Sequence, residues 1–306
     1  MITREERSYR GWPQVLRLAN DQVELLMPAA FGPRVLHFSY LSEPNLFYES
    51  TEDNSRTGGE QWRIYGGHRL WHSPEQMGRT YCPDNNPVDV REIENGLVLT
   101  QSEEPATRLQ KSLAVVLEPS GSRVEVIHRI KNCGLWPVVL SAWAISAMAP
   151  GGCSIVRPRP HQAEDPCLPN LGLSFWPHTL LGDPRFICDG ELIRLRQDTG
   201  IQRPFKVGLC CDARWVAYQN QGYIFIKQYD RQQDLPYPDH GSSIELYTCG
   251  QFSEIETLGP LQNLAPGETA EHRETWQIWK TAGSGARTRP EDVDAETIDR
   301  LKALDR

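Results

Sequence analysis

The chain has 306 residues, enough for one large domain or two ordinary ones, and all-β domains often reach this length as single units. Hydrophobic residues make up 39% of the sequence and charged residues 24%, as in a globular protein. The net charge of −8 argues against nucleic-acid and anionic-membrane partners, because both need a basic protein surface.

Neither a targeting signal nor a membrane anchor is visible in the sequence. Its first residues, MITREERSYRGWP, are charged, and no stretch has the roughly 18 consecutive apolar residues of a membrane span. We therefore expect a cytoplasmic protein. The eight cysteines form no C-x-x-C motif, which argues against a zinc ribbon, and we expect them to be free and mostly buried.

Strand patterns with turn residues between them follow one another along most of the chain. The first two lie within residues 14–29, on either side of the turn at Asn20-Asp21. Further strands are expected, in chain order, within residues 31–40, 96–101, 109–132, 136–149, 205–210, 214–230, 242–250, 253–260 and 270–280.

The end of the chain has a different pattern. GSG at 283–285 is typical of a linker, and PEDVDAETIDRLKAL at 290–304 predicts a terminal helix. The sequence has no 20–50-residue repeat, which argues against a propeller, and no phosphate-binding glycine motif. We expect an all-β sandwich or barrel over residues 1–280, and a linker with a helical tail over 281–306.

The segment GGHRLWHSPE, residues 66–75, concentrates polar side chains behind a Gly-Gly pair. On a helix, the spacing of its histidines and glutamate would suit metal ligands. The glycines before it and Ser73-Pro74 after it disfavour a helix, so we expect no metal. A ligand-binding loop is the better interpretation. Its donors are His68, Arg69 and His72, its stacking plate is Trp71 and its acceptor is Glu75. TYCPDNNPV at 80–88 continues this loop with Tyr81, Asp84 and Asn85.

Three strand patterns carry further candidates. In GYIFIKQYD, alternation places Phe225, Lys227 and Tyr229 on one face, which is either a sugar-binding face or a solvated outer face. In RVEVIHRIKN, His128 is either a core residue with its hydrogen bonds satisfied or a residue that contacts the substrate, as a binding or catalytic group. In SEIETLGP, the Cα atoms of the two glutamates lie about 7 Å apart on one face, an arrangement that raises the pKa of at least one carboxyl group if the pair is buried.

The C-terminal run at 244–279, IELYTCGQFSEIETLGPLQNLAPGETAEHRETWQIW, resembles the end of the aldose 1-epimerases, or galactose mutarotases. The matching residues are Tyr247-Thr248, Glu256-Thr257, Leu264 to Glu268, His272 and Trp276. Upstream, GGHRLW is similar to their His-Gly-Gly followed by Trp, and residues 126–145 resemble their strand, Asn and strand before a catalytic histidine. Nearly the whole chain, with its GGHRLW…TYxPDNxPV signature, also resembles a bacterial family of unknown function in the mutarotase-like superfamily.

The resemblance implies a galactose mutarotase-like β-supersandwich with a sugar cleft on a concave face. It assigns the catalytic base to Glu256, which would take a proton from the anomeric hydroxyl while a histidine protonates the ring oxygen. The two histidines of the mutarotase pattern are replaced here by Tyr65 and Trp143. His68, His72 or His128 would therefore have to be the acid, with His68 or His72 preferred, and Trp143 can stack on a sugar.

Three functions remain open after this comparison. The first is an aldose or sugar-acid epimerase without a cofactor, with Glu256, His68 and His72 as catalytic residues. Its substrate-binding residues would be Arg69, Trp71, Glu75, Tyr81, Asp84, His128, Trp143, Lys227, Tyr229 and Glu245, with Arg69 and Lys227 holding an anionic group. The second is a sugar-binding module without turnover. The third is a glycoside hydrolase or lyase that uses Glu256 with Glu254 or Glu245. Exposed edge strands make a homodimer possible.

Overall fold

The computed structural model describes residues 1–159, 167–281 and 293–305. In the first half of the chain the strands are β1 (Thr3–Tyr9), β2 (Trp12–Ala19), β3 (Val23–Pro28), β4 (Arg34–Val35), β5 (His37–Tyr40), β6 (His68–Ser73), β7 (Asp89–Ile93), β8 (Gly96–Thr100), β9 (Leu109–Leu117), β10 (Val124–Asn132), β11 (Val138–Met148) and β12 (Cys153–Val156). In the second half they are β13 (Gly172–Phe175), β14 (Phe186–Cys188), β15 (Ile193–Arg196), β16 (Phe205–Cys210), β17 (Trp215–Asn220), β18 (Tyr223–Tyr229), β19 (Ile244–Thr248), β20 (Ser253–Leu258), β21 (Gln262–Leu264) and β22 (Thr269–Lys280). The helices are α1 (Pro238–Gly241) and α2 (Ala295–Ala303).

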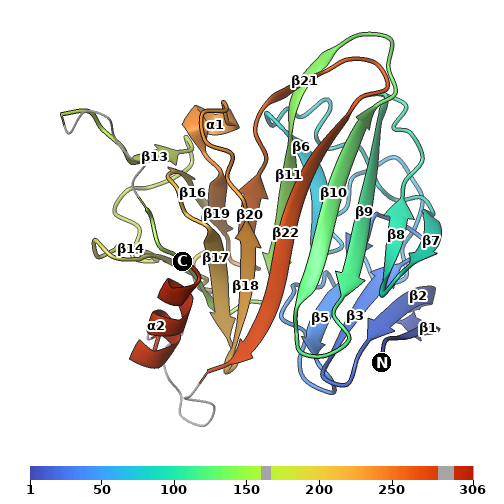
Figure 1. Ribbon diagram of the computed structural model, residues 1–306, viewed down its shortest axis with the longest axis horizontal. Coiled ribbons are helices and arrows are strands. Elements are labelled where there is room, and N and C mark those ends of the chain that lie inside the picture. Colours follow the sequence, from blue (N-terminus) through green and yellow to red (C-terminus); the bar gives the residue numbers. More distant parts are fainter. Residues whose placement is uncertain (160–166, 282–292, 306) are drawn as a thin grey trace.

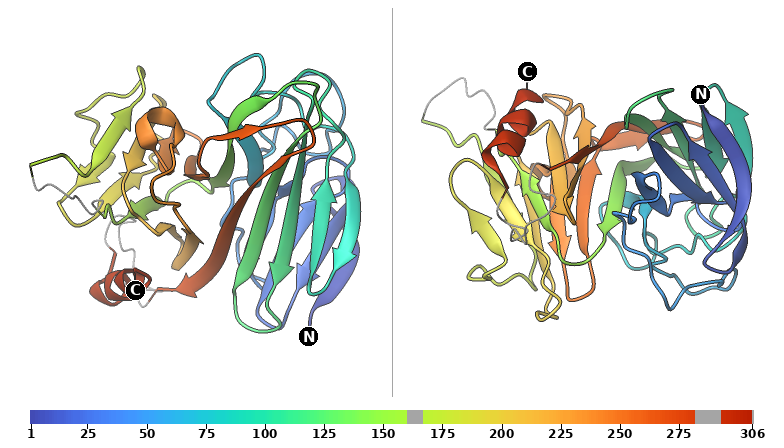
Figure 2. Two further views of the ribbon diagram at one scale, coloured as in Figure 1. Left: turned by 45° about the horizontal axis from the view of Figure 1, so that its top comes forward. Right: turned by 90° about the horizontal axis from the view of Figure 1, so that it is seen from below.

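The strands form three antiparallel sheets. A ten-stranded sheet has the order β14-β15-β12-β17-β18-β22-β10-β9-β8-β7, and an eight-stranded sheet has the order β13-β16-β19-β20-β11-β6-β4 with β21 paired to β11. The remaining four strands pair in the order β1-β2-β3-β5 near the N-terminus (Figure 1). The two views of Figure 2 show the long strand β22 running between the two halves of the molecule.

One large apolar core holds the sheets together. It takes Leu70 and Ile255 from the eight-stranded sheet, Val126 and Trp276 from the ten-stranded sheet and Leu25 from the four-stranded one. Because successive side chains of a strand point to opposite faces, every second residue of the eight-stranded sheet enters this core and the residues between them point away from it. That outer face carries the candidate site.

Helix α2 covers part of the outer face of the ten-stranded sheet. Its Leu301 and Ile298 pack with Trp215, Ile224 and Ile226 of β17 and β18, where Figure 1 shows the helix beside the lower ends of these strands. The helix begins at an Asp294 cap whose side chain accepts a hydrogen bond from the backbone N–H of Thr297. The predicted terminal helix is therefore confirmed. The expected linker at 283–285 lies outside the described residues.

Several expectations about local structure are corrected. GGHRLWHSPE is not a loop, because its central residues form β6 between β4 and β11. Strands β1, β7, β12 to β15 and β21 were not predicted from the sequence pattern. The cysteines are not mostly buried: Cys153 and Cys211 are buried, Cys167 and Cys188 are exposed, and the other four are partly exposed.

Neither described helix has the length and apolar content that a membrane crossing requires. The cytoplasmic location and the homodimer expected from the sequence stay predictions.

Candidate functional site

A cavity of about 360 Å³ opens on the outer face of the eight-stranded sheet. We call it the aromatic cavity, and its lining residues are Trp62, Ile64, Arg69, Trp71, Glu75, Tyr81, Trp143, Ile145, Trp176, His178, Pro204, Lys206, Tyr247, Phe252 and Glu254. Strands β6, β11, β16, β19 and β20 supply its floor, and the segments around residues 62, 75–81 and 176–178 supply its rim. This volume is within the ordinary range of small-molecule sites.

Aromatic rings make up much of the wall. The Trp71 ring centroid lies 4.7 Å from that of Tyr81, 5.4 Å from that of Trp62 and 5.5 Å from that of Trp143, all in edge-to-face contact. Trp143 and Trp71 face each other across the β11–β6 pair. The wall therefore offers flat apolar surfaces with indole N–H groups at their edges.

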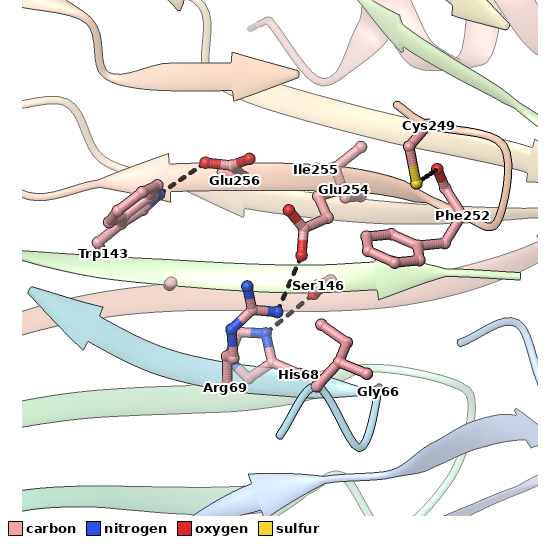
Figure 3. A network of polar contacts seen from close by, with 12 residues as sticks. Gly66, His68, Arg69, Trp143, Ser146, Cys249, Phe252, Glu254, Ile255 and Glu256 are labelled. Atoms are coloured by element: carbon pink, nitrogen blue, oxygen red, sulfur yellow. Dashed lines mark hydrogen bonds and ion pairs between the residues drawn. The ribbon is translucent and has the colours of Figure 1, made fainter. Parts of the chain in front are cut away.

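Arg69 and Glu254 form an ion pair on this face. The Nη1 atom of Arg69 lies 2.9 Å from Oε1 of Glu254 (Figure 3). The Arg69 guanidinium lies 4.4 Å from the centre of the Trp71 ring. Burial raises the pKa of the Glu254 carboxyl above its usual value, and the opposing effect of Arg69 does not cancel this. Glu254 is thus a cavity-lining carboxyl group that takes up a proton more readily than a carboxyl in water.

A second charged group lies on the cavity floor. Nζ of Lys206 is 2.7 Å from Oε2 of Glu245 and 3.2 Å from Oε2 of Glu256, and the latter oxygen also accepts a 2.7 Å hydrogen bond from Nε1 of Trp143. Burial acts against the charged ammonium, but the two carboxyl groups outweigh it and raise the pKa of Lys206. Burial also raises the pKa of Glu245 well above its usual value, and the nearby Glu256 adds to this rise. One ammonium therefore shares a buried position with two carboxyl groups.

Some polar atoms at the cavity have no hydrogen-bond partner among the described residues. They are Nε1 of Trp62, Nε of Arg69 and Oε1 of Glu256, all buried. Leaving such an atom unpaired costs about 1–3 kcal/mol. The two donors belong to lining residues beside aromatic rings and can donate to a hydroxyl-rich guest, whereas Glu256 does not line the cavity.

No protein-family model matches the sequence, and no curated protein matches it. Solved structures do match. A galactose mutarotase-like protein from Lactobacillus casei aligns with a TM-score of 0.56 and 10% identity over 87% of this chain and all of that one. One from Clostridium acetobutylicum gives 0.56 and 11% over 92% and 99% of the two chains. A galactose mutarotase related enzyme from Lactobacillus acidophilus gives 0.53 and 7% over 92% and 100%.

This chain has the galactose mutarotase-like fold. The predicted fold class is therefore confirmed, while identities of 7–11% show the fold alone. The closer resemblance to a bacterial family stays a prediction.

The mutarotase-like sheet brings some predicted residues together. Arg69, Trp71, Glu75, Tyr81 and Trp143 all line the aromatic cavity. Glu256 and Glu245 do not line it, but they contact the lining residues Trp143 and Lys206. At the rim, the Tyr81 hydroxyl donates a 2.6 Å hydrogen bond to Glu75.

The predicted histidines lie elsewhere. His68 and His72 occupy the opposite face of β6 from Arg69, in the interior between the sheets. His68 bonds Ser146 at 2.9 Å and Nε2 of His128 at 2.7 Å (Figure 3 shows the first contact). Burial, with Lys227 next, holds the pKa of His68 well below its usual value. His68 and His128 are thus corrected to core residues.

His72 is also corrected to a core position. Burial, with nearby Lys111, lowers the pKa of His72 to about 3, and neither ring nitrogen has a hydrogen-bond partner among the described residues. An imidazole that stays neutral behind the sheet cannot protonate a sugar on the other side. The predicted pairing of Glu256 with His68 or His72 across a cleft is therefore wrong.

Lys227 and Tyr229 do not face the cavity either. Nζ of Lys227 lies 2.7 Å from Oε1 of Glu274 in the core, and the Tyr229 hydroxyl lies 2.9 Å from Oγ of Ser243. Both faces of β18 are buried, because α2 covers Ile224 and Ile226 on the other side. Lys227 therefore cannot hold an anionic group on a sugar.

Asp84 has an indirect place. Its carboxylate pairs with the Arg34 guanidinium at 2.7 Å, and Arg34 donates to the backbone carbonyl groups of Ile64 and Gly66. These bonds fix the segment that carries Trp62 and Ile64 into the aromatic cavity. Asp84 thus supports the wall instead of contacting a guest.

A group of possible metal ligands lies in the core. It consists of His68, His128 and Glu274, whose ligand atoms, one from each residue, all lie within 4.8 Å of one another. Protein hydrogen bonds already occupy these atoms: the two imidazoles bond each other, and Oε2 of Glu274 accepts from Nε1 of Trp276 at 2.7 Å. The charged Lys227 beside Glu274 further disfavours a cation. The geometry fits a hydrogen-bonded network better than a metal centre.

The sequence analysis did not single out nine of the lining residues as site residues, namely Trp62, Ile64, Ile145, Trp176, His178, Pro204, Lys206, Tyr247 and Phe252. It considered Glu254 only together with Glu256, as a carboxyl pair or as the catalytic pair of a hydrolase. Tyr247 lies opposite Lys206 and Glu254 in the sheet register. It is one of the residues that carry the C-terminal resemblance, and this resemblance could have indicated it as a site residue. Trp176 and His178 follow a short edge strand that has no clear pattern.

Proposed function

We propose that the aromatic cavity binds a neutral sugar and that the protein interconverts its anomers by acid–base chemistry. Indole rings suit the C–H face of a pyranose, and unpaired N–H donors suit its hydroxyl groups. The observation that carries the proposal is that two buried N–H donors of the aromatic cavity, on Trp62 and Arg69, have no partner among the described residues. The mutarotase-like fold supports the same function.

A neutral sugar fits the charges better than a sugar acid. Arg69 is paired with Glu254, and Lys206 is paired with Glu245 and Glu256, so these two cations are already neutralised. An anionic group would have to displace a buried carboxylate from its partner, which costs several kcal/mol.

Glu254 and His178 are the acid–base pair of this proposal. Both line the cavity, and the environment moves their pKa values toward each other: burial raises that of Glu254, and burial, with Lys206 next, lowers that of His178. Anomer interconversion needs one group that takes the proton of the anomeric hydroxyl and one that protonates the ring oxygen. Two cavity-lining groups whose pKa values are shifted toward each other can give and take protons in turn as the ring opens and closes.

Glu256, to which the resemblance assigns the base, lies deeper. It is 1% exposed, and one of its oxygens is held by Trp143 and Lys206. We propose that it orients these two side chains while Glu254 contacts the sugar.

A sugar-binding module without turnover is the second candidate. The burial of His68 and His72 in the core favours it, because neither predicted histidine acid reaches the cavity. Hydrolysis is less well supported, since Glu254 and Glu256 are neighbours on one strand and do not flank a bond.

The test combines binding and turnover. Calorimetry measures the affinity for D-galactose, D-glucose and D-mannose, and polarimetry or NMR follows the anomers of each freshly dissolved sugar. Faster equilibration with wild type, lost in Glu254→Gln with binding kept, supports the epimerase. Sugar binding without faster anomer equilibration supports a binding module without turnover. If the protein binds none of the three sugars, the proposal is refuted.

A further inference from the structure

We propose that Lys206 is a substrate-binding residue whose ammonium donates a hydrogen bond to a sugar hydroxyl, and that Glu245 is the positioning residue that holds it there. This inference rests on the proposed function, because it assigns roles within the same sugar site. The sequence placed Glu245 among the binding residues and gave no role to Lys206.

The position of Lys206 combines burial with access to the cavity. The residue is 6% exposed and lines the aromatic cavity, and its Nζ lies 4.4 Å from the centre of the Trp143 ring and 4.7 Å from that of Trp176. Contact with two indole faces stabilises a desolvated cation and restricts where the ammonium can move.

The donors of the ammonium are unevenly used. A protonated lysine has three N–H donors. Two carboxyl groups lie within reach, Glu245 at 2.7 Å and Glu256 at 3.2 Å, and neither lines the cavity. This leaves the third donor for the cavity, where a hydroxyl oxygen is a suitable acceptor.

Glu245 meets the ligand only through Lys206. The Glu245 side chain is 0% exposed, and Glu245 does not line the cavity. In the sheet it lies opposite Glu256 on the next strand, and Lys206 lies opposite Tyr247, two residues further along β19. Three adjacent strands therefore fix the lysine from behind, and a change at Glu245 reaches a sugar by releasing or reorienting the ammonium.

The core supplies a matched control. Lys227 and Glu274 form another buried lysine–glutamate pair at the same 2.7 Å distance, both 0% to 1% exposed, on the far side of the eight-stranded sheet from the cavity. Removing a charge from either pair is expected to lower stability. Only the Lys206–Glu245 pair is expected to alter sugar affinity.

The experiment measures D-galactose, D-glucose and D-mannose affinity by calorimetry, with thermal stability, for wild type, Lys206→Met, Lys206→Arg, Glu245→Gln, the Lys206→Met/Glu245→Gln double variant and Glu274→Gln. We expect Lys206→Met to weaken binding at least about tenfold, which is about 1.4 kcal/mol. Lys206→Arg should recover part of this loss, and Glu245→Gln should fall between wild type and Lys206→Met. The double variant should bind like Lys206→Met alone, because Glu245 acts through the lysine. Glu274→Gln should melt earlier and bind normally.

Other results would overturn the inference. Unchanged affinity in Lys206→Met removes the binding role, and losses that multiply in the double variant remove the positioning role. If Lys206→Met does not fold, the affinities of Glu245→Gln and Lys206→Arg test the proposal instead. Wild-type sugar affinity in both of these variants would contradict it. If the wild type binds none of the sugars, the proposed function fails and this inference fails with it; if it binds them and the Lys206 and Glu245 variants match it, the inference alone fails.

Discussion

Replacing Lys227 by Met tests whether the core network depends on a compensated charge. The Lys227 side chain is fully buried, and its Nζ lies 2.7 Å from Oε1 of Glu274, 3.1 Å from the carbonyl oxygen of Ala144 and 3.3 Å from that of Ile255. The variant leaves the Glu274 carboxylate in the core with only the hydroxyl of Thr257 and Nε1 of Trp276 as donors. Breaking such a pair from one side costs about 3–5 kcal/mol.

The pH dependence has a definite sign. In wild type, burial raises the pKa of Glu274, but Lys227 and His128 outweigh it and keep that pKa below its usual 4.5. Without the lysine, burial prevails and the pKa rises above that of the unfolded chain. The stability of the variant then falls as pH rises through the new value, so its deficit is larger at pH 8 than at pH 5.

Urea unfolding at both pH values and thermal melting measure these effects. At about 2 °C per kcal/mol for a chain of this size, the melting temperature at pH 8 should fall by roughly 6–10 °C. The Lys227→Met/Glu274→Gln double variant should regain much of the loss, since it leaves no unpaired charge. A loss of less than about 1 kcal/mol in unfolding free energy at pH 8, or a double variant less stable than Lys227→Met, would show that Glu274 does not depend on the charge of Lys227.

Three further outcomes are expected. Gly67→Ala should lower the unfolding free energy measured in urea by about 2 kcal/mol or more, because the residue has a φ of +69° and a Cβ atom would lie 2.3 Å from the carbonyl oxygen of Val35. Wild-type stability would show that the structure relieves this crowding. Trp71→Ala should weaken sugar binding about tenfold through loss of its stacking surface, and unchanged affinity would place the sugar elsewhere. The rate of anomer interconversion should pass through a maximum with pH, because it needs one of the two groups protonated and the other not; the Glu254 limb should lie above the usual carboxyl pKa and the His178 limb below the usual imidazole pKa. Glu254→Gln or His178→Ala should abolish this maximum, and a rate that keeps it would exclude the pair.

Local pattern was enough to predict most of the fold. Alternation and turn residues placed the hairpin around Asn20-Asp21, which β2 and β3 confirm, and the pairs β9–β10 and β17–β18. Short strands such as β14, with three residues, are too brief to produce a periodic signal.

The side of each sheet that faces the site was harder to predict. In β18, alternation correctly grouped Phe225, Lys227 and Tyr229, but nothing local says which face of a strand meets the core. Here both faces are covered, one by the second sheet and one by α2. Aromatic and charged residues on a strand therefore indicated a binding face where the structure has a buried ion pair.

Site residues were found where several polar types cluster in sequence. Arg69 and Trp71 come from the polar segment GGHRLWHSPE and Trp143 from a strand with a visible pattern, and all three line the cavity. Lys206 and His178 are single polar residues in unremarkable surroundings, and only the pairing of distant strands brings them beside Glu254.

The alternation of β6 limits how this protein can change. His68 and Arg69 are neighbours in sequence, yet one bonds within the interior and the other faces the ligand cavity. Inserting or deleting one residue in this strand would exchange the two sets, moving Arg69 and Trp71 into the apolar interior. New ligand preferences can therefore evolve in this strand by substitution at every second position, while changes of length are confined to the connecting segments at the rim.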